Sequence, residues 1–441
     1  MTSTGPRLRG GTSKNIAITA TGYVLPMLAA FVTAPVLARE LGLEGRGHLA
    51  AATAPLLLVI GSLTLGVPES LTYHVAQGTA HPRRLLRHAA VLLVAAGAAG
   101  AGLVWVAAPW LAIDEPEVYR IMLLTTAAIV PALWVGALRG AASGLHLWPL
   151  VTRERTVSAA VRLFGVIGLA VTGTLDLGTA AAVLAAAPVL GGLVYVRLPT
   201  RLERTDVPEA PPPHLLGYGL RVWVGALSGI VLLRIDQTLV APLSSAAELG
   251  YYTVAVAIAE APLVLTAAAR NVMFAADSSE RDDERLARTS RTVTALVLLG
   301  CLALAALLPW AVPTLFGEEF TGAIPVTLLL LLATVAGTPG SFAGSALSSR
   351  GRPGLRSTSL VIACVLNVIA LVVLVPVWGA MGAAVATLIG NCVSAWLNLV
   401  WLSSRFGVTA RSFHGLRRSD VALVRDVVDR LTRRNRGHDH P

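Results

Sequence analysis

Twelve stretches of mainly apolar residues, each about 20 residues or longer, follow one another along the chain. A helix needs about 20 such residues to cross the hydrocarbon core of a bilayer. The chain of 441 residues is 55% apolar and only 14% charged, which is typical of a multi-pass membrane protein. We therefore expect an all-α membrane protein with about 12 transmembrane helices. The expected spans are 15–38, 49–76, 86–111, 118–142, 148–172, 177–198, 215–241, 248–275, 289–314, 321–348, 356–377 and 380–404.

The basic residues alternate with these spans. Of the 35 Lys and Arg residues, 29 lie before residue 15, in 77–88, 139–155, 197–221, 276–291 and 350–356, or from 405 onward. Loops with such an excess of positive charge face the cytoplasm, so we expect both termini there and place the protein in the plasma membrane. The net charge of +10 thus indicates topology and not a nucleic-acid partner. The Arg-rich, Lys-poor composition is typical of a GC-rich bacterium.

Short motifs recur in constant order at offsets of 200 to 209 residues. They include Ala34-Pro35 with Ala241-Pro242, and Glu40-Leu41-Gly42 with Glu248-Leu249-Gly250. An even number of spans in each half predicts two parallel six-helix repeats, an architecture that transporters use. The alternative is a chance placement of prolines. The predicted units are an N-terminal lobe at 1–198, a cytoplasmic linker at 199–214 and a C-terminal lobe at 215–405.

Residues 406–441 form a basic cytoplasmic tail after the last span. Apolar residues at 421, 424, 428 and 431 are spaced as on one face of a helix, with arginines between them. This pattern predicts an amphipathic helix on the anionic inner leaflet. The alternative is a solvated chain without regular structure.

Six charged residues fall within predicted spans, where a charge is costly and marks a candidate functional site. The alternative is that three acids and three bases pair to fix helix packing. The six are Glu69, Arg162, Arg234, Asp236, Glu260 and Arg270.

Arg234 is the strongest candidate for binding a substrate. Gln237 and Thr238 follow three and four residues later, on the same helix face, whereas Asp236 is rotated by about 200° and points elsewhere. Guanidinium groups bind phosphate oxygens bidentately, so this strip suits a phosphate or sugar hydroxyls. Arg162 and Arg270 are further candidates for binding the substrate.

Three of the acids are candidates for carrying a coupling ion, either H⁺ or Na⁺. They are Asp236, Glu260 and Glu69. Glu260 can instead serve as the counter-ion of an arginine. The sequence predicts no catalytic residue, cofactor or metal site, because the three cysteines lie within spans without metal-ligand spacing. The sole lysine, Lys14, does not stand in a phosphate-binding P-loop.

The run Arg234-Ile-Asp236, followed by Glu248-Leu-Gly250-Tyr251-Tyr252, resembles the polysaccharide-flippase branch of the multidrug/oligosaccharidyl-lipid/polysaccharide (MOP) exporter superfamily. The segment from Ala38 to Gly47 is similar to the first outer loop of that branch, and 379–384 to the start of its twelfth span. The resemblance covers roughly residues 15–405. It implies two six-helix bundles that form a V around a central cavity.

The resemblance also implies a function. The protein would be a flippase that moves an undecaprenyl-pyrophosphate oligosaccharide from the inner to the outer leaflet by alternating access, for cell-surface polysaccharide biosynthesis. Its partners would be this lipid-linked oligosaccharide, membrane lipids and other polysaccharide assembly proteins.

Two alternatives stay open. A cation-coupled small-molecule or multidrug antiporter would share the fold, although the carboxylate that the drug-exporting branch uses in its first helix is missing. A membrane glycosyltransferase or polymerase would need larger outer loops than those predicted here.

Overall fold

The computed structural model describes residues 12–78, 81–112, 114–198, 215–415 and 417. Every regular element within these ranges is helical. The predicted linker at 199–214 and the predicted amphipathic helix after residue 418 lie outside them. The first group of elements is α1 (Thr12–Ser62), α2 (Val67–Gln77), α3 (Pro82–Leu111), α4 (Pro116–Thr125), η1 (Thr126–Ala128), α5 (Ile129–Gly144), α6 (Trp148–Val171), α7 (Leu177–Gly191) and η2 (Gly192–Tyr195).

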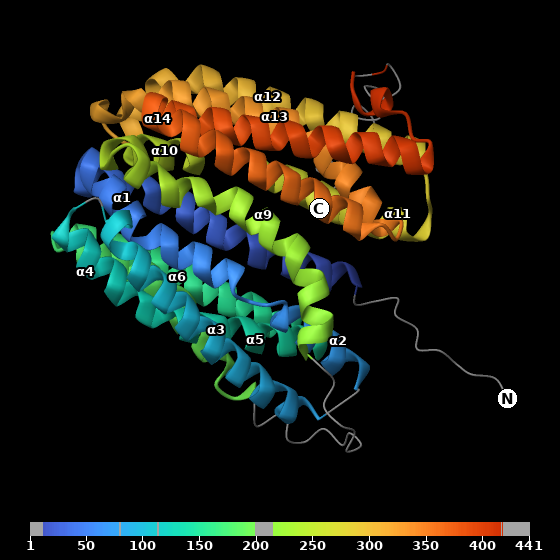
Figure 1. Cartoon of the computed structure of the whole chain (residues 1–441), viewed down its shortest axis with the longest axis horizontal. Coiled ribbons are helices and arrows are strands. Elements are labelled where there is room, and N and C mark those ends of the chain that lie inside the picture. The colour runs from blue at the N-terminus through green and yellow to red at the C-terminus, as the bar shows by residue number, and fades with distance from the viewer. Residues whose placement is uncertain (1–11, 79–80, 113, 199–214, 416, 418–441) are drawn as a thin grey trace, which may run out of the picture.

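A second group of elements follows residue 215. It comprises α9 (Leu215–Leu243), α10 (Ala246–Ala259), α11 (Leu263–Ser279), α12 (Asp283–Leu315), η3 (Glu318–Gly322), α13 (Ala323–Ser349), α14 (Pro353–Phe406) and η4 (Ala410–Phe413). Figure 1 shows the two groups as two layers of nearly parallel helices, with α9 running along the boundary between them. Across this boundary α1 packs against α9 and α10.

Local sequence signals start the helices where loops give way to apolar runs. Proline stands in the first turn of α2, α3, α4, α6 and α14, where its missing N–H costs no hydrogen bond. The side chains of Asp176, Ser245 and Asp282 cap α7, α10 and α12 by accepting a backbone N–H three residues on. Such caps satisfy donors that a helix start leaves unpaired.

The described residues contain eight helical stretches that are long and apolar enough to cross a membrane, or nine if the bent pair of α10 and α11 forms one span. Large apolar side chains also cover the outside of the molecule. Val106 is 82% exposed on α3, as are Val171 on α6 (82%) and Val377 on α14 (74%). Such surfaces fit a hydrocarbon environment and would be unusual in water.

The two longest helices each contain one non-helical glycine with a positive φ, Gly42 (φ 70°) in α1 and Gly379 (φ 54°) in α14. Figure 1 shows both helices running from the α2 end of the molecule to the α4 end and back. The sequence predicted a loop at 39–48, whereas helical structure continues there on both sides of Gly42. At Gly379 an added Cβ would lie 2.3 Å from Oε2 of Glu248, an atom that also accepts the Ala380 N–H at 2.7 Å.

Candidate functional site

Charged side chains from both groups of helices meet where α6 approaches the start of the second group. Arg162 lies on α6, Arg234 on α9 and Glu260 at the junction of α10 and α11. Nη1 of Arg234 is 3.7 Å from Oε1 of Glu260. Arg162 interacts electrostatically with both, and its Nε donates to the Thr33 hydroxyl at 3.1 Å.

The Arg234–Glu260 pair is only partly shielded. The two side chains are 38% and 37% exposed, although both lie several helical turns away from the α4 end of the molecule. A separation of 3.7 Å is longer than a hydrogen bond between charged groups. The pair is therefore loose, and another anion can compete with Glu260 for the guanidinium.

Arg46 is a third arginine of this region. It follows the Gly42 kink in α1 and interacts electrostatically with Arg162. Its Nε is buried and has no hydrogen-bond partner among the described residues. The sequence placed Arg46 between two predicted spans, in an outer loop. Gly47 lets α1 approach α10, since an added Cβ would lie 1.8 Å from the carbonyl oxygen of Ala246.

We define Arg46, Arg162, Arg234 and Glu260 as the arginine cluster. Arg162 interacts with Arg46, Arg234 and Glu260, and the carboxylate of Asp236 also interacts with Arg234 and Glu260. Three guanidinium groups thus meet two carboxylates, which leaves an excess of positive charge inside the molecule. An unpaired charge in a low-dielectric region is costly. This arrangement therefore favours a bound anion with several acceptor oxygens.

Asp236 makes its hydrogen bonds away from the Arg234–Glu260 contact, as its rotation on the helix predicted, but it still interacts electrostatically with both residues. Its carboxylate is 4% exposed and accepts a short hydrogen bond from the Tyr252 hydroxyl, which lies 3.1 Å from the Thr387 hydroxyl. The N–H of Gln237 also donates to Asp236, at 2.7 Å. Among the described residues, the six charges within the predicted spans thus do not form three ion pairs.

The remaining predicted binding residues occupy different places. Thr238 is buried, and its hydroxyl donates to the carbonyl of Arg234 at 3.4 Å. This bond directs the hydroxyl toward the backbone of its own helix. Gln237 is half-buried on the same helix. Arg270 lies on α11, where it interacts electrostatically with Arg356 of α14. The structure therefore brings Arg162 and Arg234 together, with Arg270 in another part of the molecule.

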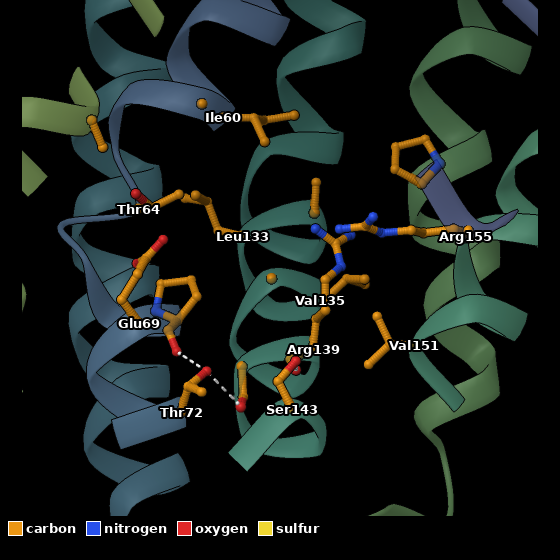
Figure 2. A pocket seen from close by; sticks show the side chains of 18 of the residues that line it. Ile60, Thr64, Glu69, Thr72, Leu133, Val135, Arg139, Ser143, Val151 and Arg155 are labelled. Carbon is orange, nitrogen blue, oxygen red and sulfur yellow. Dashed lines mark hydrogen bonds between the residues drawn. The ribbon is translucent and has the colours of Figure 1, made fainter. Parts of the chain in front are cut away.

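A cavity of about 450 Å³ lies among α1, α2, α5, α6, α7 and α9. Three charged side chains line it, namely Glu69 of α2, Arg139 of α5 and Arg155 of α6. Figure 2 shows the guanidinium groups of Arg139 and Arg155 pointing toward one another, with Glu69 on the opposite wall. Thr64, Thr72, Ser143, Thr152 and Trp148 complete its polar and aromatic lining.

Arg139 is held by a bidentate ion pair. Its Nε and Nη2 donate to the two carboxylate oxygens of Glu154 at 2.9 and 3.0 Å. Glu154 is 2% exposed, whereas Arg139 is 36% exposed. The buried carboxylate thus fixes the orientation of a guanidinium that borders the cavity. The sequence counted Arg139 and Arg155 only as loop charges that set topology.

Residues 12–274 match the family described as polysaccharide biosynthesis protein. The chain belongs to this family. It is also 26% identical over 215 residues to the probable low-salt glycan biosynthesis flippase Agl15 of Haloferax volcanii. That match covers 47% of this chain and 45% of the archaeal protein, so the aligned part spans about half of the relative's length.

Two solved structures place the family member in a known fold. The lipid II flippase MurJ in an inward closed conformation is similar with a TM-score of 0.70, at 10% identity, over 88% of this chain and 87% of that one. An inward-facing multidrug resistance MATE family transporter of the MOP superfamily is similar with a TM-score of 0.67, at 14% identity, over 88% and 98%. Family, fold and apolar helices identify a multi-pass membrane transporter of this superfamily and not an enzyme, as the sequence predicted.

Proposed function

We propose that this transporter moves a lipid-linked oligosaccharide, joined to its lipid by pyrophosphate, from the inner to the outer leaflet of the plasma membrane. The observation that supports this most is the arginine cluster, in which three guanidinium groups outnumber the two carboxylates, Glu260 and Asp236, that interact with them. The printed name of the archaeal relative, a glycan biosynthesis flippase, agrees with this cargo. An organic cation, the cargo of the alternative drug antiporter, would be repelled by the same charges.

The cluster has the chemistry to hold a pyrophosphate. Each guanidinium presents several N–H donors in a planar fork that matches phosphate oxygens. Arg234 would exchange its 3.7 Å contact with Glu260 for shorter bonds to the phosphate, and the unpartnered Nε of Arg46 would gain an acceptor. The lipid tail would remain in the bilayer, outside the helices.

We further propose alternating access between the two groups of helices. In this view α1 and α14 each cross the membrane twice, so that each half contributes six spans with both termini in the cytoplasm. The halves are joined at the α4 end, where Nε of Arg39 donates to the Leu315 carbonyl at 3.0 Å and another of its nitrogens donates to the Thr314 carbonyl. Breaking these contacts would open the cluster toward the outer leaflet.

Coupling to an ion gradient is part of the same proposal. Asp236 is buried against Tyr252 and adjoins Arg234 in the chain, so a change in its protonation would alter the field at the cluster. Glu260 contacts the cluster directly, and Glu69 faces the cavity. All three stay candidate carriers of H⁺ or Na⁺.

The test compares Arg234→Gln with wild type in proteoliposomes that contain a fluorescent undecaprenyl-pyrophosphate oligosaccharide. We expect the rate of transfer between leaflets to fall about tenfold or more, because hydrogen bonds to charged groups contribute about 1.5–3 kcal/mol each. Arg352→Gln, at an exposed position, should transfer lipid at the wild-type rate.

A second variant separates binding from packing. Glu260→Gln removes the competing carboxylate and should preserve lipid binding or tighten it. If Arg234 only fixed helix packing through its ion pair, the two substitutions would weaken lipid binding to the same extent. That result would contradict an anion-binding cluster.

A further inference from the structure

We propose that the cavity lined by Glu69, Arg139 and Arg155 binds the first sugars of the cargo, next to a pyrophosphate held by the arginine cluster. This inference rests on the proposed function and assigns its sugar-recognition site. The ligand class is a neutral, hydroxyl-rich saccharide of one or two rings.

The lining has the chemistry of a sugar site. The hydroxyls of Thr64, Thr72, Ser143 and Thr152 lie beside a carboxylate and two guanidinium groups. Sugar hydroxyls both donate and accept, so they suit a wall that mixes acidic and basic groups. Trp148 adds an apolar ring face with a polar N–H, and 450 Å³ lies within the range of small-ligand pockets.

The balance of charge distinguishes the cavity from the arginine cluster. Around the cavity, Arg139 and Arg155 are matched by Glu154 and Glu69, so the wall is polar but close to neutral. At the arginine cluster three cations meet two anions, Glu260 and the adjoining Asp236, so positive charge is in excess. The pyrophosphate therefore gains more from the cluster, and the uncharged sugars can satisfy the cavity without competing with it.

The two sites lie along the same helix faces. On α6, Thr152, Arg155 and Arg162 recur at intervals of three and seven residues, which keeps them on one side of the helix. On α9, Ile230 lines the cavity and Arg234 follows one turn later. At about 1.5 Å of rise per residue, these steps are about 10 Å and 6 Å. A pyrophosphate and the sugar attached to it can bridge such an interval.

Parts of the cavity wall are held in place before any ligand binds. The buried Glu154 orients Arg139, as described above. The hydroxyl of Thr72 donates to the carbonyls of Pro68 and Gly140, both at 2.9 Å, and so ties α2 to α5. Ser143 donates to the Arg139 carbonyl at 2.8 Å. Each hydroxyl oxygen keeps an acceptor face for a sugar, and prior ordering lowers the entropy cost of binding.

The test measures protection of introduced thiols from maleimide. Cys301, Cys364 and Cys392 are first replaced by serine, and either Ser143→Cys or Gln237→Cys is added. Ser143 lines the cavity, whereas Gln237 lies one turn from Arg234. The full-length protein in nanodiscs is incubated with undecaprenyl pyrophosphate, or with the same lipid carrying an N-acetylglucosamine disaccharide or a glucose disaccharide.

We expect both kinds of lipid to slow labelling of the Gln237→Cys thiol, and only a sugar-bearing lipid to slow labelling of the Ser143→Cys thiol. Protection at Gln237→Cys alone by all lipids would overturn the sugar site and leave the proposed function intact. Equal protection at Ser143→Cys by the sugar-free lipid would also overturn it. Protection at neither position would overturn the proposed function, and the sugar site with it.

Binding affinities give an independent readout. Arg155→Gln should weaken binding of a sugar-bearing lipid about tenfold, the loss expected for one hydrogen bond to a charged group, and should leave binding of undecaprenyl pyrophosphate unchanged. Arg153→Gln, on the same helix but exposed, is the matched control and should change neither. Equal weakening of both lipids by Arg155→Gln would contradict a site specific for sugar.

Discussion

Two bidentate arginine–carboxylate pairs, one in each half of the molecule, have similar hydrogen bonds but different surroundings. In the first half, Glu154 binds Arg139, which is 36% exposed beside the cavity. In the second half, Nη2 of Arg350 is 2.7 Å from Oδ1 of Asp277, and these side chains are 2% and 1% exposed. Asp283 binds Nη1 of Arg350 at 2.7 Å, and the Phe406 ring lies 5.5 Å from the guanidinium carbon.

The difference shows which pair can act on a ligand. Arg350 is almost fully buried by protein, so this pair can only hold α11, α12, α14 and the end of α13 together. Although burial opposes its charge, hydrogen bonds to Asp277 and Asp283 raise the pKa of Arg350 above its ordinary value, so it stays protonated at any working pH. Arg139 has the same partner chemistry but is 36% exposed and borders the cavity.

The largest effect should come from breaking the closed pair. Arg350→Gln leaves Asp277 as a buried charge without its main partner, and removing one member of a buried pair costs about 3–5 kcal/mol. We expect a marked fall in the midpoint of thermal unfolding in detergent. Arg352→Gln should leave that midpoint unchanged. Equal midpoints for the two variants would show that the Arg350 site does not stabilise the fold.

Arg139→Gln should affect transport more than stability, in contrast to Arg350→Gln. Water in the cavity can solvate part of the change, so we expect a smaller loss of stability than for Arg350→Gln. Transfer of the lipid-linked oligosaccharide should nevertheless fall, because the cavity loses an oriented donor. Unfolding midpoints and transfer rates of the two variants test this. A larger loss of stability for Arg139→Gln would contradict the contrast between the two sites.

An aromatic residue contacts each of the two pairs, Phe406 at Arg350 and Tyr195 at Glu154, and its removal should have a smaller effect on stability. Phe406→Leu removes a cation–π contact with Arg350 and should lower the free energy of unfolding by about 1 kcal/mol. Tyr195 donates to Glu154 over 3.5 Å, a distance at the limit of a hydrogen bond. Tyr195→Phe should therefore lower the free energy of unfolding less than Phe406→Leu, as measured in paired denaturation curves. The opposite order would contradict the stronger aromatic contact at Arg350.

The smallest effect should come from an exposed charge with only local partners. The backbone and side chain of Thr179 donate to Asp176 and lower the pKa of its carboxyl below 3.8. A lowered pKa in the folded state stabilises the protein above the ordinary pKa of aspartate and loses this contribution as the pH falls through the folded pKa. Asp176→Ala should cost about 1 kcal/mol at neutral pH. Its unfolding midpoint should converge with that of wild type in acid, and a difference that persisted there would contradict the assignment.

Several features of this fold follow from local sequence. The apolar stretches predicted long apolar helices. The rotation between successive helix positions predicted that Arg234 and Asp236 lie on different faces. The chain breaks at Glu260–Pro262, where α10 and α11 meet at 47°, as a proline in a span suggests. The loop predicted at 39–48 is shorter in the structure, because the chain turns at Gly42 and helical structure continues on both sides of it.

The site depends on contacts that no local pattern records. Arg46 joins the cluster only because α1 turns back at Gly42 and packs on α10. Arg139 and Arg155 lie near predicted loops in the sequence. The cavity beside them forms because α1, α2, α5, α6 and α7 of the first half and α9 of the second surround it. The positions of charges within predicted spans identified Arg162 and Arg234 as candidates for binding the substrate. They could not show that Arg270 lies elsewhere, where it interacts with Arg356.

The most direct test of the central claim is a comparison of two cargoes in one preparation. Proteoliposomes containing the wild-type protein would receive a fluorescent undecaprenyl-pyrophosphate oligosaccharide or an organic cation dye, and movement of each across the bilayer would be measured. We predict that the lipid-linked oligosaccharide moves between leaflets and the dye does not. Movement of the dye driven by a cation gradient, without movement of the lipid, would contradict the account and identify a drug antiporter.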